Sequence, residues 1–234
     1  MKMMNDGFSR ESQITWDTIA QSFDNTRRKP WKQCVEFLNK CSKNDTLVDI
    51  GCGNGRHLLL SGKIFRKAIG IDISIALLKI VKKRIFENKI DNVFLVHSDF
   101  VNLPLKSNSA DAVLFIASLH NVKGRENRVK ALCEVRRILK KDGKVLISVW
   151  SRWQDRYRKM FFKKWFTSIG KNEFGDIDIF WRQNGLNIPR FYHLYSKKEF
   201  KNDIIKAGLK IVELKSEKII SKKYPDNYFV IAQR

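Results

Sequence analysis

Residues 48–56 read VDIGCGNGR, and this stretch decides the fold of the 234-residue chain. An apolar, β-branched run ends in three glycines at alternate positions, Gly51, Gly53 and Gly55, and a helical pattern follows them. Glycine lets the backbone turn sharply and approach a ligand closely, because it carries no Cβ. The stretch therefore predicts a strand, a tight turn and a helix around a ligand.

A second segment points to the kind of ligand. Asp72 follows another strand-like run, residues 68–71, and an acid about 20 residues beyond such a loop can accept hydrogen bonds from both ribose hydroxyls of a nucleoside cofactor. The glycines follow G-x-G-x-G, with Asp49 before them, which suits a cofactor with a cationic amino-acid end and no pyrophosphate: S-adenosylmethionine (SAM). The alternative is a tight turn with an incidental acid downstream. The predicted cofactor contacts here are Asp49, Gly51, Cys52, Gly53, Asn54, Arg56, Asp72 and Ile73.

Composition indicates one folded domain that works inside the cell. Hydrophobic residues make up 43% of the chain, which is typical of a globular protein. No apolar run approaches the roughly 18 residues needed to cross a bilayer, and residues 1–10 lack the apolar core of a signal peptide. The cysteines are scattered, without a C-x-x-C pair, so we expect no metal site and a cytoplasmic protein with reduced thiols and no membrane partner. They are Cys34, Cys41, Cys52 and Cys133.

The charge indicates a polyanionic partner. The chain has 46 Lys and Arg against 24 Asp and Glu, a net charge of +22, and both halves are basic. Such an excess repels itself in a compact fold and is usually kept for a polyanion. A large nucleic acid fits this distribution better than a small anion or an anionic membrane surface, and the alternative is a Lys- and Asn-rich genome bias.

Strand and helix patterns alternate along the chain, which predicts a Rossmann-like, doubly wound α/β fold. We expect a mostly parallel seven-stranded sheet whose last two strands form an antiparallel edge hairpin. Strand patterns occupy residues 46–50, 67–71, 92–97, 110–117, 143–150, 209–217 and 227–233. Helical patterns occupy residues 54–61, 75–88, 125–140 and 197–207, after two N-terminal helices within residues 13–41.

Residues 151–196 break the alternation with an aromatic and basic segment. The segment follows the fifth strand and so leaves the sheet at its carboxyl edge, where open α/β sheets bind ligands. Aromatic faces beside Arg and Lys suit an unstacked RNA base and its phosphates. We interpret it as a cap over the substrate side of the cofactor, and most of its rings are expected to form a small core of its own.

The ends of the third and fourth strands complete the predicted cofactor site. Asp99, after Ser98, is placed to accept a hydrogen bond from an adenine amino group, and Phe100 follows it. The fourth strand ends at Ile116 and Ala117. His120, shortly after it, is expected either to line the pocket or to cap the next helix.

These residues resemble the class I SAM-dependent methyltransferases, and further segments narrow the resemblance. The segments are W-D-x-I-A-x-x-F-D-x-T-R-x-x-P-W at 16–31, N-G-R-H at 54–57, R-x-x-R at 125–128, V-W at 149–150 and R-F-Y-H-L-Y at 190–195. Together they resemble the wobble-uridine tRNA methyltransferases that esterify 5-carboxymethyluridine at anticodon position 34, and the resemblance runs from about residue 13 to the C-terminus. One departure is His120-Asn121, where the family often has two histidines. The resemblance implies a tRNA substrate and a small zinc-binding activator subunit as partner.

The chemistry of such a substrate agrees with the charged residues. A carboxymethyl group is ionised at neutral pH, because its pKa is near about 4, so methyl transfer to it needs no strong base. The enzyme must align the reacting atoms and hold the carboxylate dry. The expected substrate contacts are Arg27, His120, Arg190, Tyr192 and His193. The alternatives are a solvated basic joint for Arg27 and packing of the cap for Tyr192 and His193.

Three functions remain open at this stage. The first is an RNA methyltransferase, in which Asp72 holds the cofactor and the Arg and His residues hold the substrate. The second is a methyltransferase of a small molecule, which the net charge disfavours. The third is a non-catalytic RNA-binding member of the fold, which the intact cofactor motif disfavours.

Overall fold

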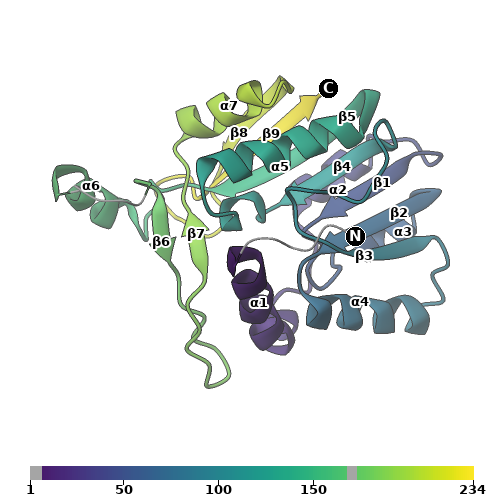
Figure 1. Ribbon diagram of the computed structural model, residues 1–234, viewed down its shortest axis with the longest axis horizontal. Coiled ribbons are helices and arrows are strands. Elements are labelled where there is room, and N and C mark those ends of the chain that lie inside the picture. The colour runs from purple at the N-terminus through teal and green to yellow at the C-terminus, as the bar shows by residue number, and fades with distance from the viewer. Residues whose placement is uncertain (1–6, 168–172) are drawn as a thin grey trace.

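A seven-stranded sheet forms the centre of the computed structural model, which describes residues 7–167 and 173–234 (Figure 1). The strand order is β3-β2-β1-β4-β5-β9-β8. The first five are parallel to their neighbours, and β9 is antiparallel to both β5 and β8. This confirms the predicted Rossmann-like fold with its antiparallel edge. The strands are β1 (Thr46–Ile50), β2 (Lys67–Asp72), β3 (Val93–His97), β4 (Ala110–Ile116), β5 (Leu139–Trp150), β8 (Lys210–Glu217) and β9 (Asn227–Gln233).

Helices cover both faces of the sheet because successive strand residues point to opposite faces. Val48 and Ile50 of β1 join the core cluster that contains α5 and α7, whereas Leu47 joins the cluster that contains α2. Within the described ranges, no helix has the length and apolar character that a membrane crossing needs. The helices are α1 (Gly7–Thr26), α2 (Lys32–Leu38), α3 (Leu58–Gly62), α4 (Ile75–Glu87), α5 (Arg125–Ile138), α6 (Arg158–Thr167), α7 (Lys197–Lys206) and the short 3-10 helix η1 (Leu119–Asn121).

The first N-terminal helix begins at Gly7, before its predicted start at residue 13, and two boundaries around the sheet were also wrong. The helix expected at 54–61 begins only at Leu58, because the glycine turn continues through Gly55, whose φ is +78°. The strand expected at 143–150 begins at Leu139 instead, since this buried residue pairs with Ala110 of β4 before a register shift. Both errors lie where backbone geometry overrides the side-chain pattern.

The insertion after β5 protrudes from the sheet and reaches back to α1 (Figure 1). It contains α6 and a two-stranded antiparallel sheet of β6 (Asp176–Asp178) and β7 (Phe191–His193). Several of its rings form a separate small core around Tyr157 and Phe161. The indole N–H of Trp181, beyond β6, donates to the hydroxyl of Ser22 in α1 at 2.8 Å. The insertion thus has a core of its own and also closes one side of the space above the sheet.

Candidate active site

A cavity of about 530 Å³ lies at the carboxyl ends of β1, β2 and β4, under α1 and the insertion. Most of the residues predicted from the sequence line it. They are Arg27, Gly51, Cys52, Gly53, Asn54, Arg56, Asp72, Ile73, Asp99, Phe100, Ile116, Ala117, His120, Arg190 and Tyr192. The structure does not place Asp49, Ser98 or His193 among the lining residues.

The glycine loop forms a cradle that side chains would fill. Gly51 and Gly53 have φ values of +70° and +55°, a region that other residues rarely adopt. A Cβ added at Gly51 would overlap the hydroxyl of Ser118. The backbone N–H groups of Gly51 and Cys52 both donate to the carbonyl of Ile71, which fixes the loop against β2. The loop therefore leaves room for a ligand close to the backbone.

Asp72 is held ready to bind hydroxyl groups. Its Oδ2 accepts the backbone N–H of Gly53 at 2.8 Å, and its Oδ1 accepts that of Ser74 at 2.9 Å. Burial raises the pKa of this carboxyl to about 6, although the same hydrogen bonds lower it. Each oxygen can accept a further bond, so the residue fits two ribose hydroxyls.

Asp49 lies behind the residues that line the cavity, and one of its carboxylate oxygens lacks a hydrogen-bond partner among the described residues. Its Oδ2 is buried and has no hydrogen-bond partner in the described part of the chain. Burial, together with the nearby charge of Asp72, raises the pKa of Asp49 to about 7, although Arg56 acts in the opposite direction. A buried carboxylate needs a cation or donor. The cationic amino-acid end of SAM would meet that need, so the residues present fit this cofactor.

We expect SAM to bind more tightly as the pH rises toward neutrality. Because the pKa of Asp49 is raised to about 7, the SAM-free folded protein holds this carboxyl in its protonated form at low pH. The stability that the protonated form contributes is lost as the pH rises through about 7. A bound cation favours the ionised form. The association constant should therefore rise by up to about tenfold per pH unit below that value and level off above it. Calorimetric titrations would show this, and Asp49→Asn should keep only the weaker dependence from Asp72. A wild-type profile identical to that of the variant would contradict the role of Asp49.

The side chain of Asn54 serves α1 rather than the cofactor. Its Nδ2 donates to Asp24 Oδ1 at 2.9 Å and to the backbone carbonyl of Arg27 at 2.7 Å. Arg84 of α4 pairs with Asp24 at 2.8 Å and donates to the carbonyl of Asn54. Asp17 of α1 also accepts bonds from the start of α4. These contacts fasten α1, and with it Arg27, to the glycine loop.

Asp99 and Phe100, which the sequence predicts as cofactor contacts, line the cavity. Asp99 Oδ1 accepts the backbone N–H groups of Val101 and Asn102, both at 3.1 Å. The hydroxyl of Ser98 instead donates to the carbonyls of Asp99 and Asn102. Ser98 thus shapes this turn, and only Asp99 and Phe100 reach the cavity.

His120 offers a neutral donor next to a stack of rings. Tyr192 lies parallel to both His120 and Trp150, with ring centroids 5.1 and 5.0 Å apart. His120 Nδ1 accepts the backbone N–H of Trp150 at 3.1 Å, which leaves the proton on Nε2, and Nε2 is buried without a partner in the described ranges. Burial, with help from the charge of Arg190, lowers the pKa of His120 to about 3. At neutral pH it is therefore an uncharged N–H donor that lacks an acceptor.

Arg190 sits in an aromatic cage. Its guanidinium lies over Trp181 at 4.9 Å, Tyr192 at 5.1 Å and Trp16 at 5.6 Å, and donates to the Tyr192 hydroxyl at 2.7 Å. It is buried, its Nε has no partner, and it makes no ion pair with the described residues. Arg27 lines the same cavity and also lacks an acidic partner there. Arg56 lines the cavity too and makes no ion pair with the described residues, so three guanidinium groups without a carboxylate partner share one cavity.

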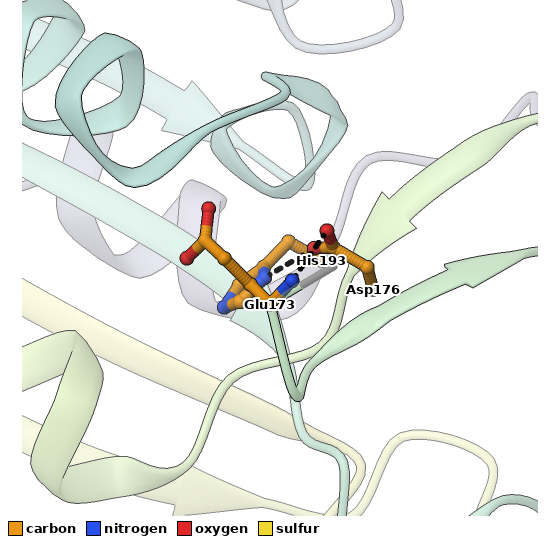
Figure 2. A group of neighbouring side chains, drawn as sticks. All are labelled: Glu173, Asp176 and His193. Atoms are coloured by element: carbon orange, nitrogen blue, oxygen red, sulfur yellow. Dashed lines mark hydrogen bonds and ion pairs between the residues drawn. The ribbon is translucent and has the colours of Figure 1, made fainter. Parts of the chain in front are cut away.

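His193 belongs to an ion-pair cluster that joins the insertion to α7, and it is not among the cavity-lining residues. Its Nδ1 bonds to Asp176 at 2.7 Å and its Nε2 to Glu199 at 2.8 Å. Burial disfavours its charge, but these two acids raise the pKa of His193. Figure 2 shows the pair with Asp176 and the neighbouring Glu173, whose carboxylate bonds to Arg128 at 2.6 Å. Both ring nitrogens of His193 already have hydrogen-bond partners, so its placement favours a structural role over a direct contact with substrate.

Comparisons with known proteins fit this site. A family model described as a methyltransferase domain matches residues 48–147. A tRNA (carboxymethyluridine(34)-5-O)-methyltransferase of Schizosaccharomyces pombe is 30% identical over 242 residues, which cover 94% of both chains. The chain belongs to the tRNA (carboxymethyluridine(34)-5-O)-methyltransferase family. The macaque member from Macaca fascicularis is 34% identical over 160 residues, 68% of this chain.

The chain spans only 20% to 32% of the length of the vertebrate and plant family members it matches. Among solved structures, a SAM-dependent methyltransferase from Methanosarcina mazei has a TM-score of 0.72 at 19% identity and covers 88% of this chain and 98% of its own. A Haloferax volcanii methyltransferase, solved with a Trm112 activator, has a TM-score of 0.66 at 16% identity and covers 96% of both chains. At such identities these structures show a shared fold.

Four aromatic residues that line the cavity of this family member were not among the site residues predicted from the sequence. They are Trp16, Phe23, Trp31 and Trp150. Three of them recur at helical spacing near the N-terminus, a pattern that equally indicates a buried helix face. Only the docking of α1 over the glycine loop turns this face toward a ligand. The resemblance segments at residues 16–31 and 149–150 contain these four residues and were the available signals.

Proposed function

We propose that this chain is a tRNA methyltransferase that transfers a methyl group from SAM to the carboxylate of 5-carboxymethyluridine at the anticodon wobble position. One observation carries the proposal. Arg27 and Arg190 line the cavity that also contains the glycine loop and Asp72, and neither has an acidic partner among the described residues. Guanidinium groups bind carboxylates by planar two-point contacts. A carboxylate substrate would satisfy both.

The residues of this chain hold and orient the substrate rather than move protons. SAM, when bound, supplies an activated methyl group. Arg27 and Arg190 grip the carboxylate, and the Nε2–H of His120 donates to one of its oxygens. The aromatic cage of Trp16, Trp181 and Tyr192 keeps water from this grip. Because the carboxylate is already ionised at neutral pH, no general base is required, and alignment in a dry site supplies the rate enhancement.

Substitution of His120 tests the neutral donor. His120→Ala should lower kcat for tRNA by about tenfold to a hundredfold, because one hydrogen bond to the reacting carboxylate is lost, while SAM affinity stays unchanged. Since the pKa of His120 is lowered to about 3, its protonation should leave the pH–rate profile flat between about pH 6 and 8. Stopped assays with labelled SAM across this range measure both. A His120→Ala variant with full activity would rule out the contact.

We further infer two partners and a location. The net charge of +22 supports a tRNA substrate, because Lys and Arg bind phosphates. The likeness to the Haloferax volcanii protein, whose structure contains the Trm112 activator, supports a small activator subunit here. The four cysteines, none in a disulfide, fit the reducing cytoplasm.

The decisive experiment is methyl transfer from labelled SAM to tRNA that carries 5-carboxymethyluridine without its methyl ester, with and without a candidate activator. Digestion of the product should give a base-labile methyl ester on 5-carboxymethyluridine. SAM binding without any label in tRNA under either condition would overturn the proposal. Label on added metabolites instead would favour a small-molecule methyltransferase.

A further inference from the structure

A second cavity of about 920 Å³ lies directly beside the active-site cavity. The two cavities share Arg27, Trp31, Arg56 and Trp150 in their walls. The second is built from the joint between α1 and α2, the start of the insertion at 154–157, and the loop between β8 and β9. We name it the flanking groove. It is continuous with the place where the target nucleotide would enter.

The flanking groove carries exposed positive charge. Arg28, Lys29, Arg156 and Lys222 line it and are exposed, and none of them makes an ion pair within residues 7–167 and 173–234. Together with Arg27 and Arg56 of the shared wall, they surround one hollow. Such a concentration of like charge is unfavourable unless an anion is bound.

The two acids in the groove make no ion pair with these cations, and backbone amides hold both of them. Asp155 accepts the N–H groups of Lys222, Lys223 and Tyr224 at 2.8 to 2.9 Å. Asp226 likewise accepts three consecutive N–H groups, from residues 219–221, at 2.6 to 2.8 Å. These six bonds fix the β8–β9 loop in one conformation. The charged wall is therefore organised before any ligand arrives.

The same loop exposes an apolar side chain to solvent. Ile220 is 85% exposed at the rim of the groove, and Ile219 beside it is also exposed. An exposed isoleucine on a tightly fixed loop among cations contributes nothing to the core. Apolar surface next to phosphate-binding cations is what a nucleotide requires, since it presents an anion and a flat base together.

We infer that the flanking groove binds the RNA nucleotide adjacent to the methylated one, with its phosphates on Lys29, Arg156 and Lys222 and its base against Ile220. This inference rests on the proposed function, because the groove is placed by its continuity with the substrate cavity. It assigns a binding subsite for single-stranded RNA that lies outside the catalytic contacts. Different residues then bind the substrate carboxylate and the RNA strand.

Two charge variants of equal net change test the groove. One is Lys29→Ala, Arg156→Ala and Lys222→Ala together. The control is Lys79→Ala, Lys82→Ala and Lys201→Ala, three exposed lysines on α4 and α7 that line neither cavity. The probe is a fluorescent, unmodified anticodon stem-loop RNA, whose binding is followed by anisotropy at several salt concentrations. Methyl transfer to tRNA that carries 5-carboxymethyluridine, and to the free nucleoside 5-carboxymethyluridine, is measured in parallel.

We expect the groove variant to bind the RNA on the order of tenfold to a hundredfold more weakly, and the slope of log affinity against log salt to fall by about 2, because three single-strand phosphate contacts are lost. Ile220→Ser should weaken binding about threefold with an unchanged slope, because it removes apolar contact without charge. SAM affinity and transfer to the free nucleoside should stay unchanged in all of them. The control variant should retain most of the affinity.

Each outcome decides one question. If the groove and control variants lose affinity equally, or if the wild-type protein does not bind the RNA, the groove is not a subsite and the inference fails. If the wild type binds RNA but labels neither tRNA nor the nucleoside, the proposed function fails, and the binding comparison alone judges the groove. Loss of SAM affinity in the groove variant would show a folding defect. The Ile220→Ser variant then decides: weaker RNA binding with an unchanged salt slope supports the subsite, and wild-type RNA binding contradicts it.

Discussion

Replacing Arg190 by alanine should reduce kcat/KM for tRNA by about two to three orders of magnitude and leave SAM affinity unchanged. Removing one partner of a buried charge pair costs about 2–5 kcal/mol, and Arg190 is buried, whereas Arg27 and Arg56, the other arginines of the cavity, are partly exposed. Its removal leaves the substrate carboxylate in an aromatic cage without its strongest partner. Steady-state kinetics with labelled SAM, beside a SAM titration, measure the effect.

A conservative variant separates charge from geometry. Arg190→Lys keeps the positive charge but loses the planar contact with Trp181 and the two-point grip, so its activity should lie between those of the wild type and Arg190→Ala. Near-ultraviolet circular dichroism checks that the cage remains packed. Wild-type kcat/KM in the alanine variant would show that the carboxylate is held elsewhere.

Asp72→Ala should weaken SAM binding by about a hundredfold or more. Two charge-assisted bonds to the ribose hydroxyls are lost, each worth about 1.5–3 kcal/mol. The variant also frees the backbone N–H groups of Gly53 and Ser74, which Asp72 now binds. Isothermal titration calorimetry gives the affinity directly.

Asp72→Asn provides the matched control, since it keeps one acceptor oxygen and the size of the side chain. We expect an intermediate loss of affinity and intact RNA binding in the anisotropy assay. Unchanged SAM affinity in the alanine variant would mean that the ribose lies elsewhere in the cavity.

The fold and the cofactor side of the site followed from local sequence. The glycine spacing requires positive φ at Gly51 and Gly53, and the acid after β2 must emerge at the same sheet edge, so short-range rules were sufficient. These short-range rules did not predict the direction in which each side chain points. Asn54 follows the glycines in sequence yet bonds to Asp24, because α1 folds over the loop.

The substrate side depended on contacts that the sequence does not encode locally. Tyr192 and His193 are neighbours on β7, whose residues alternate in direction, so one reaches the cavity and the other joins Asp176 and Glu199. Alternation predicts that the two differ but not which one faces substrate. That choice depends on how the insertion packs against α1 and η1.

The hydrogen bond between Trp181 and Ser22 joins residues separated by 159 positions along the chain. Loops of this size close slowly, because their ends must meet by chance before any contact forms. The contacts of α1 are with the glycine loop, α4 and the insertion, all later in the sequence. We therefore expect the side of the cavity between α1 and the insertion to be completed late in folding, after the insertion has reached α1.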